Sequence, residues 1–402
     1  MSWSALKSLG ISQLALAVTF IATGIVVNFF QAVIYLTIRP WDATLFRKIN
    51  YYLTYVFNAH IVFLVEWWSG TKAVMYADKD EVTKFFGKEH AVLVANHGCE
   101  VDWLMGWTIG ERVGILGNAR SYIKRILQYA PVLGWSWKFQ EFVMLDRNWE
   151  QDKKNIGPQL RILASYPDPI WLTLFAEGTR FTEEKYLASV KVAKEKGLQP
   201  LLHHLLPRTR GFVASVPHLK GKVAAIYDVV VAVDKNSQHE PSVFSMLKGR
   251  EVKTVLLFRR IPLEQVPDDE KEAGAWLHKL FQEKDKVLDN YVKYGEFIPA
   301  KDKNREEYAS YKNFTTFEIP RRPYTLLNSC FWLAAVLIPL VYYLCQIVMS
   351  GDVGRISVVA GLIGAAHFGF SKLIGLAKVS TGSKYGSVEL DGQSGLNKHK
   401  TR

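Results

Sequence analysis

The chain has 402 residues, of which 49% are hydrophobic, and it carries a formal net charge of +12. This length permits two domains, or one domain with appendages, and the middle of the chain is long enough to bury a full core. The three cysteines, Cys99, Cys330 and Cys345, exclude a disulfide framework and a zinc-binding spacing, as expected of a protein in a reducing compartment.

Several long apolar segments predict membrane helices. Residues 14–38 carry no charge and exceed the roughly 20 residues that a helix needs to cross a bilayer core. Residues 326–349 are also uncharged, residues 356–377 are less apolar, and the short link between them favours a helical hairpin. Residues 51–68 mix aromatic with polar residues and are expected to lie at the membrane interface. A buried core helix is the alternative for 14–38, and an amphipathic helix packed on the core is the alternative for 51–68.

Basic residues near these segments predict their orientation. Lys7 alone precedes the first apolar segment, whereas Arg39, Arg47 and Lys48 follow it. Because lysine and arginine concentrate on the cytosolic side, we expect the N-terminus outside the cytosol and the region after residue 38 inside it. Basic residues also flank both ends of the hairpin, which predicts that both of those ends are cytosolic.

The middle of the chain alternates between apolar runs and charged stretches with helical periodicity. This alternation predicts an α/β fold whose sheet is covered on both faces. Strands are expected at 91–95, 113–116, 142–145, 170–175, 223–233 and 252–258, and helices at 121–129, 149–165, 182–196 and 268–291. The expected organisation is an N-terminal membrane-anchoring helical region at 1–77, the α/β domain at 78–322, C-terminal membrane helices at 323–378 and a disordered tail at 379–402.

The segment "VLVANHGCEVDWL" ends an apolar run in a histidine that is followed five residues later by an aspartate, Asp102. A strand that ends at Ala95 places Asn96 and His97 at a sheet edge where α/β proteins usually bind ligands. His97 and Asp102 cannot share a helix face at this spacing, so they can meet only if His97 lies in the turn before a helix. The carboxylate would then fix one imidazole nitrogen and leave the other as a base. A helix cap and a surface histidine are the alternative.

A second strand-like run ends in "FAEGTRFTEEK". Gly178 would allow the backbone to approach a ligand closely, and the guanidinium of Arg180 suits a phosphate. A helix that begins near Thr182 would point its positive end toward an anion. Other strand ends also deliver basic residues: Arg120, Lys124, Arg125, Arg147, Arg208 and Arg210. Any one of these clusters could be a solvated surface, but their joint placement predicts an anion site.

These motifs resemble those of the glycerolipid acyltransferases. "NHGCEVD" is similar to the NHxxxxD box and "FAEGTR" to the EGTR box, and "APVLGW", "LDRNWEQD", "LPRTRGF" and "AAIYDVVVAV" extend the likeness. The whole resembles the longer eukaryotic 1-acyl-sn-glycerol-3-phosphate acyltransferases. The resemblance implies a mixed sheet flanked by helices, an N-terminal membrane helix motif and a C-terminal helical hairpin in the membrane.

The resemblance also implies a reaction and a set of site residues. An acyl group would pass from acyl-CoA to the sn-2 hydroxyl of lysophosphatidic acid, with His97 as general base and Asp102 as its support. Glu177, Gly178, Thr179 and Arg180 would bind the glycerol-phosphate end, assisted by Lys124 and Arg147, and Asn96 would assist the oxyanion. Acyl-CoA is expected as a co-substrate without a bound cofactor or metal, and the lipid bilayer as a partner. No nucleic acid is expected to bind, and the expected location is the endoplasmic reticulum membrane, with the catalytic domain facing the cytosol.

Alternative functions remain open at this stage. The acceptor could be another lysophospholipid, such as lysophosphatidylinositol or a lysocardiolipin, and a non-catalytic lipid-binding membrane protein or a hydrolase could share the fold. Cys99 falls in the variable spacer of the first box and is not expected to be a nucleophile. His203 and His204 are expected to be a satisfied polar pair rather than metal ligands.

Overall fold

The computed structural model describes residues 3–234 and 236–378, and the tail expected at 379–402 lies outside these described residues. The described part of the chain contains an eight-stranded sheet with the order β4-β3-β5-β2-β6-β7-β1-β8. The strands β4, β3, β5, β2 and β6 are mutually parallel, whereas β7 and β1 run the opposite way. The strands are β1 (Lys72–Asp78), β2 (Ala91–Ala95), β3 (Ala119–Lys124), β4 (Val143–Leu145), β5 (Trp171–Phe175), β6 (Ala225–Val233), β7 (Lys253–Pro262) and β8 (Phe314–Phe317).

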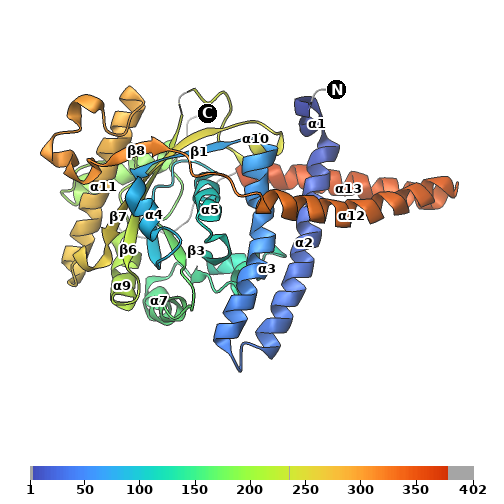
Figure 1. Ribbon diagram of the computed structural model, residues 1–402, viewed down its shortest axis with the longest axis horizontal. Helices are drawn as coiled ribbons and strands as arrows, with labels where there is room; N and C mark the ends of the chain where they lie inside the picture. Colours follow the sequence, from blue (N-terminus) through green and yellow to red (C-terminus); the bar gives the residue numbers. More distant parts are fainter. Residues whose placement is uncertain (1–2, 235, 379–402) are drawn as a thin grey trace, which may run out of the picture.

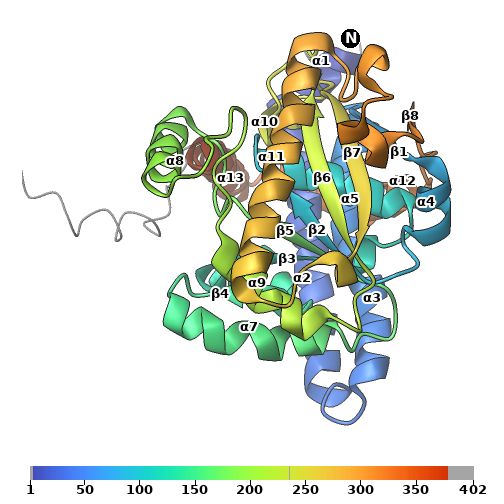
Figure 2. The same cartoon turned by 90° about the vertical axis from the view of Figure 1, so that its left-hand side faces the viewer.

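Helices cover both faces of this sheet, as Figures 1 and 2 show. Alternate residues of β2 point to opposite faces, so Leu93 packs in one core with α5 and Val94 packs in the other with α7, α9 and α11. These helices are α4 (Lys79–Phe85), α5 (Asp102–Arg112), α6 (Leu133–Phe139), α7 (Trp149–Leu163), α8 (Glu183–Glu195), α9 (Thr209–Leu219), α10 (Val243–Leu247) and α11 (Glu270–Tyr294). The predicted mixed sheet flanked by helices is therefore confirmed.

Two of the predicted elements are wrong. Residues 113–116 were expected to form a strand, but they end α5 and enter a 3-10 turn through Gly114, whose φ is +81°. Residues 121–129 were expected to form a helix, but residues 119–124 form β3 and a 3-10 helix follows. Tyr122 and Lys124 pair with β4, and the start of β3 pairs with β5, so sheet pairing overrides the local helical periodicity.

The N-terminal region forms α1 (Trp3–Ser8) and an antiparallel pair, α2 (Gly10–Thr37) and α3 (Ala43–Phe63), which continues as a π-helix at Leu64–Trp68. Both ends of α2 reach the sheet domain. Near one end, Lys7 donates to the carbonyl of Trp68 and packs against Gly249. At the other end, Arg39 forms an ion pair of 3.0 Å with Glu141.

This arrangement favours a different orientation from the one expected for the first apolar segment. Contacts of both ends of the helix with the sheet domain favour an N-terminus on the same side of a membrane as that domain. The positions of lysine and arginine predict orientation from the charge near the ends of a segment. They do not predict that α3 runs antiparallel to α2 and packs against it.

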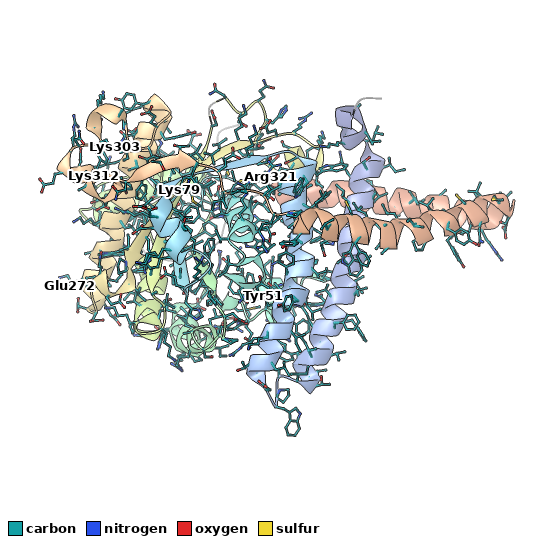
Figure 3. All side chains as sticks on the ribbon, viewed as in Figure 1. Tyr51, Lys79, Glu272, Lys303, Lys312 and Arg321 are labelled. Carbon is teal, nitrogen blue, oxygen red and sulfur yellow. The ribbon has the colours of Figure 1, made fainter. Side chains whose placement is uncertain are left out.

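The C-terminal hairpin consists of α12 (Tyr324–Met349) and α13 (Val353–Lys378) and projects away from the sheet domain (Figure 1). Arg321, labelled in Figure 3, lies where α12 begins beside α3. There, Asn328 Nδ2 donates to Val56 O at 3.0 Å and Trp67 Nε1 donates to Thr325 Oγ1 at 3.1 Å. Beyond this contact most of α12 is exposed and apolar, and α2 and α12 are both long and apolar enough to cross a membrane.

Candidate active site

The carboxyl ends of the parallel strands β2, β3, β4 and β5 lie at one edge of the sheet, and each ends in predicted site residues. At the end of β2, Nδ1 of His97 lies 3.1 Å from Oδ2 of Asp102, the first residue of α5. The side chain of Asp102 is 1% exposed, whereas that of His97 is 23% exposed. If Nδ1–H donates to the carboxylate, the lone pair of Nε2 is left to accept a proton from a bound molecule.

The loop between His97 and Asp102 is folded around this carboxylate. The amide of Cys99 donates to Asp102 Oδ2 at 3.0 Å, and its thiol donates to Oδ1 at 2.7 Å. Burial, together with the neighbouring charge of Asp102, raises the pKa of the Cys99 thiol far above its usual range. Cys99 is therefore held as a neutral thiol, which is a poor nucleophile, in agreement with the prediction.

Glu177 follows β5 and connects three segments of the site. Its Oε1 accepts a hydrogen bond from the amide of His97 at 2.8 Å, and its Oε2 accepts one from the amide of Leu205 at 2.9 Å. The side chain is buried, and burial raises the pKa of Glu177, although His204 and the two amides oppose the rise. This geometry assigns Glu177 to holding the backbone of the site rather than to direct contact with a ligand.

The side chain of Asn96 also forms hydrogen bonds with the backbone. Its Nδ2 donates to Val231 O at 3.1 Å, and its Oδ1 accepts from Val231 N at 2.7 Å, so the side chain continues the pairing of β2 with β6. Asn96 is buried, and these contacts do not support its expected role as a donor to an oxyanion.

Five cationic side chains gather beside the His97–Asp102 pair. Partial burial and the charges of Arg147 and Lys185 lower the pKa of Lys124. Partial burial and the charges of Arg180, Arg147 and Arg208 lower the pKa of Lys185, while Glu184 opposes that change. Lys124 thus lies within electrostatic range of Arg147 and Lys185, and Lys185 lies within range of Arg180, Arg147 and Arg208. We call these five residues the cation cluster: Lys124, Arg147, Arg180, Lys185 and Arg208.

The backbone around the cation cluster adopts conformations that side chains rarely take. Arg147 has a φ of +61°, a left-handed conformation that is costly for a residue other than glycine. Gly178 has a φ of +73°, and a Cβ added there would lie 3.0 Å from Cδ of Arg208. The glycine that was predicted to admit a ligand therefore also makes room for Arg208.

The cation cluster is directly linked to His97. The amide of Phe181, next to Arg180, donates to the carbonyl of His97 at 2.8 Å. Lys185 Nζ donates to Thr179 Oγ1 at 2.8 Å, so the predicted Thr179 orients a lysine. The structure thus brings together most of the predicted residues, with Thr179, Gly178 and Glu177 in supporting positions.

Sequence reasoning missed Lys185 and did not connect Arg208 with Arg180. The sequence feature that could have indicated Lys185 is its position in the first turn of α8, directly after Glu183 and Glu184. Of the other basic residues considered, Arg120 is buried and donates to the carbonyls of Gly117 and Ala119, so it is structural.

The histidine pair near residue 203 has carboxylate partners. His203 Nε2 lies 3.0 Å from Asp289 Oδ1, and His204 Nδ1 lies 2.9 Å from Asp285 Oδ1. No group of three His, Cys, Asp or Glu side chains suited to a metal ion occurs within residues 3–234 and 236–378. These pairings agree with the interpretation of His203 and His204 as a satisfied polar pair.

Comparison with known proteins identifies the family. Residues 74–233 match the acyltransferase family, and residues 245–332 match the acyltransferase C-terminus family. The chain is 41% identical over 384 residues to the 1-acyl-sn-glycerol-3-phosphate acyltransferase gamma of Homo sapiens, which covers 96% of this chain and 97% of that protein. It is 39% identical over 384 residues to the delta protein of Homo sapiens, with the same coverage of 96% and 97%. The crystal structure of the 1-acyl-sn-glycerophosphate acyltransferase PlsC from Thermotoga maritima aligns with a TM-score of 0.43 and 14% identity, covering 71% of this chain and 98% of that one. The chain is an acyltransferase and belongs to the 1-acyl-sn-glycerol-3-phosphate acyltransferase family.

Proposed function

We propose that this protein transfers a fatty acyl group from acyl-CoA to the sn-2 hydroxyl of lysophosphatidic acid and so makes phosphatidic acid. The observation that carries the proposal is that the His97–Asp102 pair and the cation cluster belong to the same edge of the sheet, where the amide of Phe181, next to Arg180, donates to the carbonyl of His97. A base and a phosphate-binding site at one sheet edge suit an acceptor that carries a hydroxyl close to a phosphate. The names of the human gamma and delta relatives point to the same acceptor.

The chemistry follows from the two ring nitrogens of His97. Nε2 removes the proton of the acceptor hydroxyl while the oxygen attacks the thioester carbonyl carbon, and Asp102 stabilises the imidazolium through Nδ1–H. The tetrahedral intermediate then collapses, the carbon–sulfur bond breaks, and His97 returns the proton to the departing CoA thiolate. The alcohol attacks directly, so the step needs no acyl-enzyme intermediate on Cys99.

The cation cluster explains the choice of acceptor. A phosphate monoester carries close to two negative charges at neutral pH, whereas the phosphodiester of lysophosphatidylinositol carries one. Five cations around one location favour the monoester, and Arg147 and Arg180 offer planar donors for its oxygens. Lys124 and Lys185 add point charges to the same location.

The long apolar helices supply the second requirement of this reaction, which is access to lipid substrates. Both the acceptor and the acyl-CoA donor are amphiphilic, and α2 and α12 associate the protein with a membrane. We place the protein in the endoplasmic reticulum membrane with its sheet domain facing the cytosol, where the net charge of +12 suits an anionic leaflet.

The proposal is tested with a panel of acceptors. Purified full-length protein in liposomes is given oleoyl-CoA with lysophosphatidic acid, lysophosphatidylinositol, monolysocardiolipin or monoacylglycerol. We expect the highest kcat/KM with lysophosphatidic acid. A higher kcat/KM with one of the other acceptors would contradict the acceptor assignment, and an absence of transfer to all of them would contradict the proposed reaction.

The role of the cation cluster is tested by Lys185→Met in the same panel. Because the variant removes a charge at the phosphate, KM for lysophosphatidic acid should rise about tenfold, the effect of losing roughly 1.4 kcal/mol of binding. Lys191→Met removes the same charge from an exposed position on the same helix and serves as the matched control. Equal KM values in the two variants would show that Lys185 does not bind the phosphate.

A further inference from the structure

Helix α11 covers one face of the sheet, over β6 and β2, as Figure 2 shows. It carries a fully buried lysine, Lys284. Lys284 is 0% exposed. It lies outside the cation cluster, beside the core residues Leu280 and Phe281. A buried ammonium is costly unless every one of its donors is paired, so its partners indicate why it is there.

Lys284 bridges β2, near its C-terminal end, and the middle of β6. Its Nζ donates to Val94 O of β2 and to Val229 O of β6, each at 2.8 Å. It also forms an ion pair with Oδ1 of Asp228 on β6. Burial alone would raise the pKa of Asp228, but Lys284 and Arg259 hold it below its usual value; burial lowers the pKa of Lys284, and Asp228 opposes that change.

One of the two carbonyls lies shortly before residues of the site. Val94 is three residues before His97, and the intervening Asn96 is tied to Val231, two residues after Val229. Lys284 and Asn96 therefore both connect β2 to β6, and both connections lie shortly before His97 in the sequence. The direction from which His97 leaves the sheet depends on both attachments.

The next residue of α11, Asp285, is connected to His97 indirectly, through residues 202–205 and Glu177. The carboxylate of Asp285 accepts hydrogen bonds from the amides of Leu202 at 2.6 Å and His203 at 2.8 Å, and it lies 2.9 Å from His204 Nδ1. The amide of Leu205, directly after this segment, donates to Glu177, whose other oxygen holds the amide of His97.

We propose that Lys284 and Asp285 of α11 are positioning residues for acyl transfer: Lys284 fixes β2, which leads to His97, against β6, and Asp285 fixes the 202–205 segment that holds Glu177 against the His97 backbone. This inference rests on the proposed function of the site. Neither residue lies in the cation cluster, so both act on the placement of the base rather than on the binding of the phosphate.

Because these residues act on the placement of His97 and not on the binding of the phosphate, their loss should affect kcat and KM differently. A displacement of about 1 Å at a reacting group can lower the rate about 100-fold. The cation cluster is held by other contacts, including the amide of Arg208, which donates to Ala176 O at 2.8 Å. Loss of either α11 side chain should therefore lower kcat and leave KM for lysophosphatidic acid nearly unchanged.

The test compares Lys284→Met and Asp285→Asn with wild-type full-length protein in liposomes. We expect kcat to fall about 10- to 100-fold, with KM for lysophosphatidic acid changed less than about threefold. Backbone amides of residues 96–100 should exchange hydrogen faster in both variants, while β6 and β7 stay protected. Asp285→Asn keeps the size of the side chain, so it carries the test alone if Lys284→Met fails to fold.

Arg259→Gln is the control for a general loss of stability. Arg259 is the other cationic partner of Asp228, at 2.8 Å, and it also pairs with Glu283 and Ser310, none of which belongs to β2. It should lower the melting temperature with little effect on kcat. A kcat loss in Arg259→Gln equal to that in Lys284→Met and Asp285→Asn, or an unchanged kcat in the latter two, would overturn the positioning role. A wild-type protein that fails to acylate lysophosphatidic acid would instead overturn the proposed function.

Discussion

The five-residue spacing of His97 and Asp102 has a structural cause in the β2–α5 loop. Asp102 is the first residue of α5, where the helix dipole favours a negative charge, and its carboxylate accepts from the Cys99 amide within the loop. The same carboxylate lies against Nδ1 of His97, which stacks on the ring of Phe175 with centroids 4.6 Å apart. The loop can close in this way because the two residues are separated by a turn rather than by a helix.

Replacement of Asp102 by Asn should separate the geometry of the pair from its electrostatics. The amide keeps the size of the carboxylate but cannot stabilise an imidazolium, so kcat should fall between about 10²- and 10⁴-fold. Initial rates with oleoyl-CoA and lysophosphatidic acid measure this effect.

Cys99→Ser is the matched control within the same loop. Its hydroxyl can still donate to Asp102, so activity should stay within about threefold of wild type, since no step of the proposed reaction uses the thiol. A larger loss in Cys99→Ser than in Asp102→Asn would contradict the assigned roles of both residues.

Residues could be predicted from the sequence where the chemistry is local. His97 with Asp102, and Glu177 with Arg180, stand in short contiguous motifs, so their types and spacing were informative. Lys284 lies 187 positions after His97 in the sequence and acts through backbone carbonyls of two strands, which leaves no local pattern. Asn96 was placed correctly at the strand end, but its pairing with β6 depends on a strand that the motif does not include.

At the scale of elements, α5 links the site to the membrane helices. It begins with Asp102 and ends at Glu111 and Arg112. Arg112 Nε donates to Glu66 Oε1 of the π-helix at 2.7 Å, and Arg322, just before α12, donates to Glu111 O at 2.9 Å. The element that supplies Asp102 is thus also connected to the start of the C-terminal hairpin.

The stability of this joint should depend on pH through Glu111. Burial raises the pKa of Glu111 to about 7, against an ordinary value of 4.5. The folded protein therefore retains a proton that the unfolded chain has already released, and this stabilisation is lost as pH rises from about 4.5 through 7. Glu111→Gln cannot titrate and lacks this dependence.

The measurement is the difference in melting temperature between wild type and Glu111→Gln in one detergent. This difference should fall by about 2–4 °C as pH rises from 5 to 8, in favour of the variant. A difference that stays constant, or that grows in favour of wild type, would show that Glu111 is ionised throughout this range.

The errors in element prediction share a physical origin. Residues 119–124 contain two cationic residues, Arg120 and Lys124, and have helical periodicity, yet they form β3 between β4 and β5. Arg120 is accommodated there by carbonyls of its own loop and by the faces of Phe142 and Tyr166. The long helices α7, α8 and α11 and the buried strands β2, β5 and β6 were predictable because their own periodicity or apolar length agrees with the final packing.

At the scale of the whole molecule, two membrane-associating units contact each other. The α2–α3 pair lies along the sheet domain, and the α12–α13 hairpin meets α3 and extends away from that domain (Figures 1 and 3). Asn328 and Thr325 of α12 bond to this N-terminal unit. The sheet domain is therefore flanked by two long apolar units, one N-terminal to it and one C-terminal to it in the sequence.

This arrangement predicts that the N-terminus and the sheet domain lie on the same side of the membrane. In microsomes, an N-terminal extension that carries an Asn-X-Thr acceptor should remain without glycan, and so should the exposed native acceptor at Asn313. A glycan on the extension alone would restore a membrane-crossing α2 and contradict the contacts of Lys7 and Arg39. A glycan at Asn313 would contradict the cytosolic placement of the sheet domain.

The central claim is that His97 is the base for acyl transfer to lysophosphatidic acid. The most direct measurement follows phosphatidic acid formed from labelled oleoyl-CoA and lysophosphatidic acid by wild type and by His97→Ala, with circular dichroism and liposome flotation as controls for folding and membrane binding. We predict that wild type forms phosphatidic acid and that the variant loses at least about 10²- to 10⁴-fold in rate while it remains folded and membrane-bound. A folded variant that retains the wild-type rate would contradict the account.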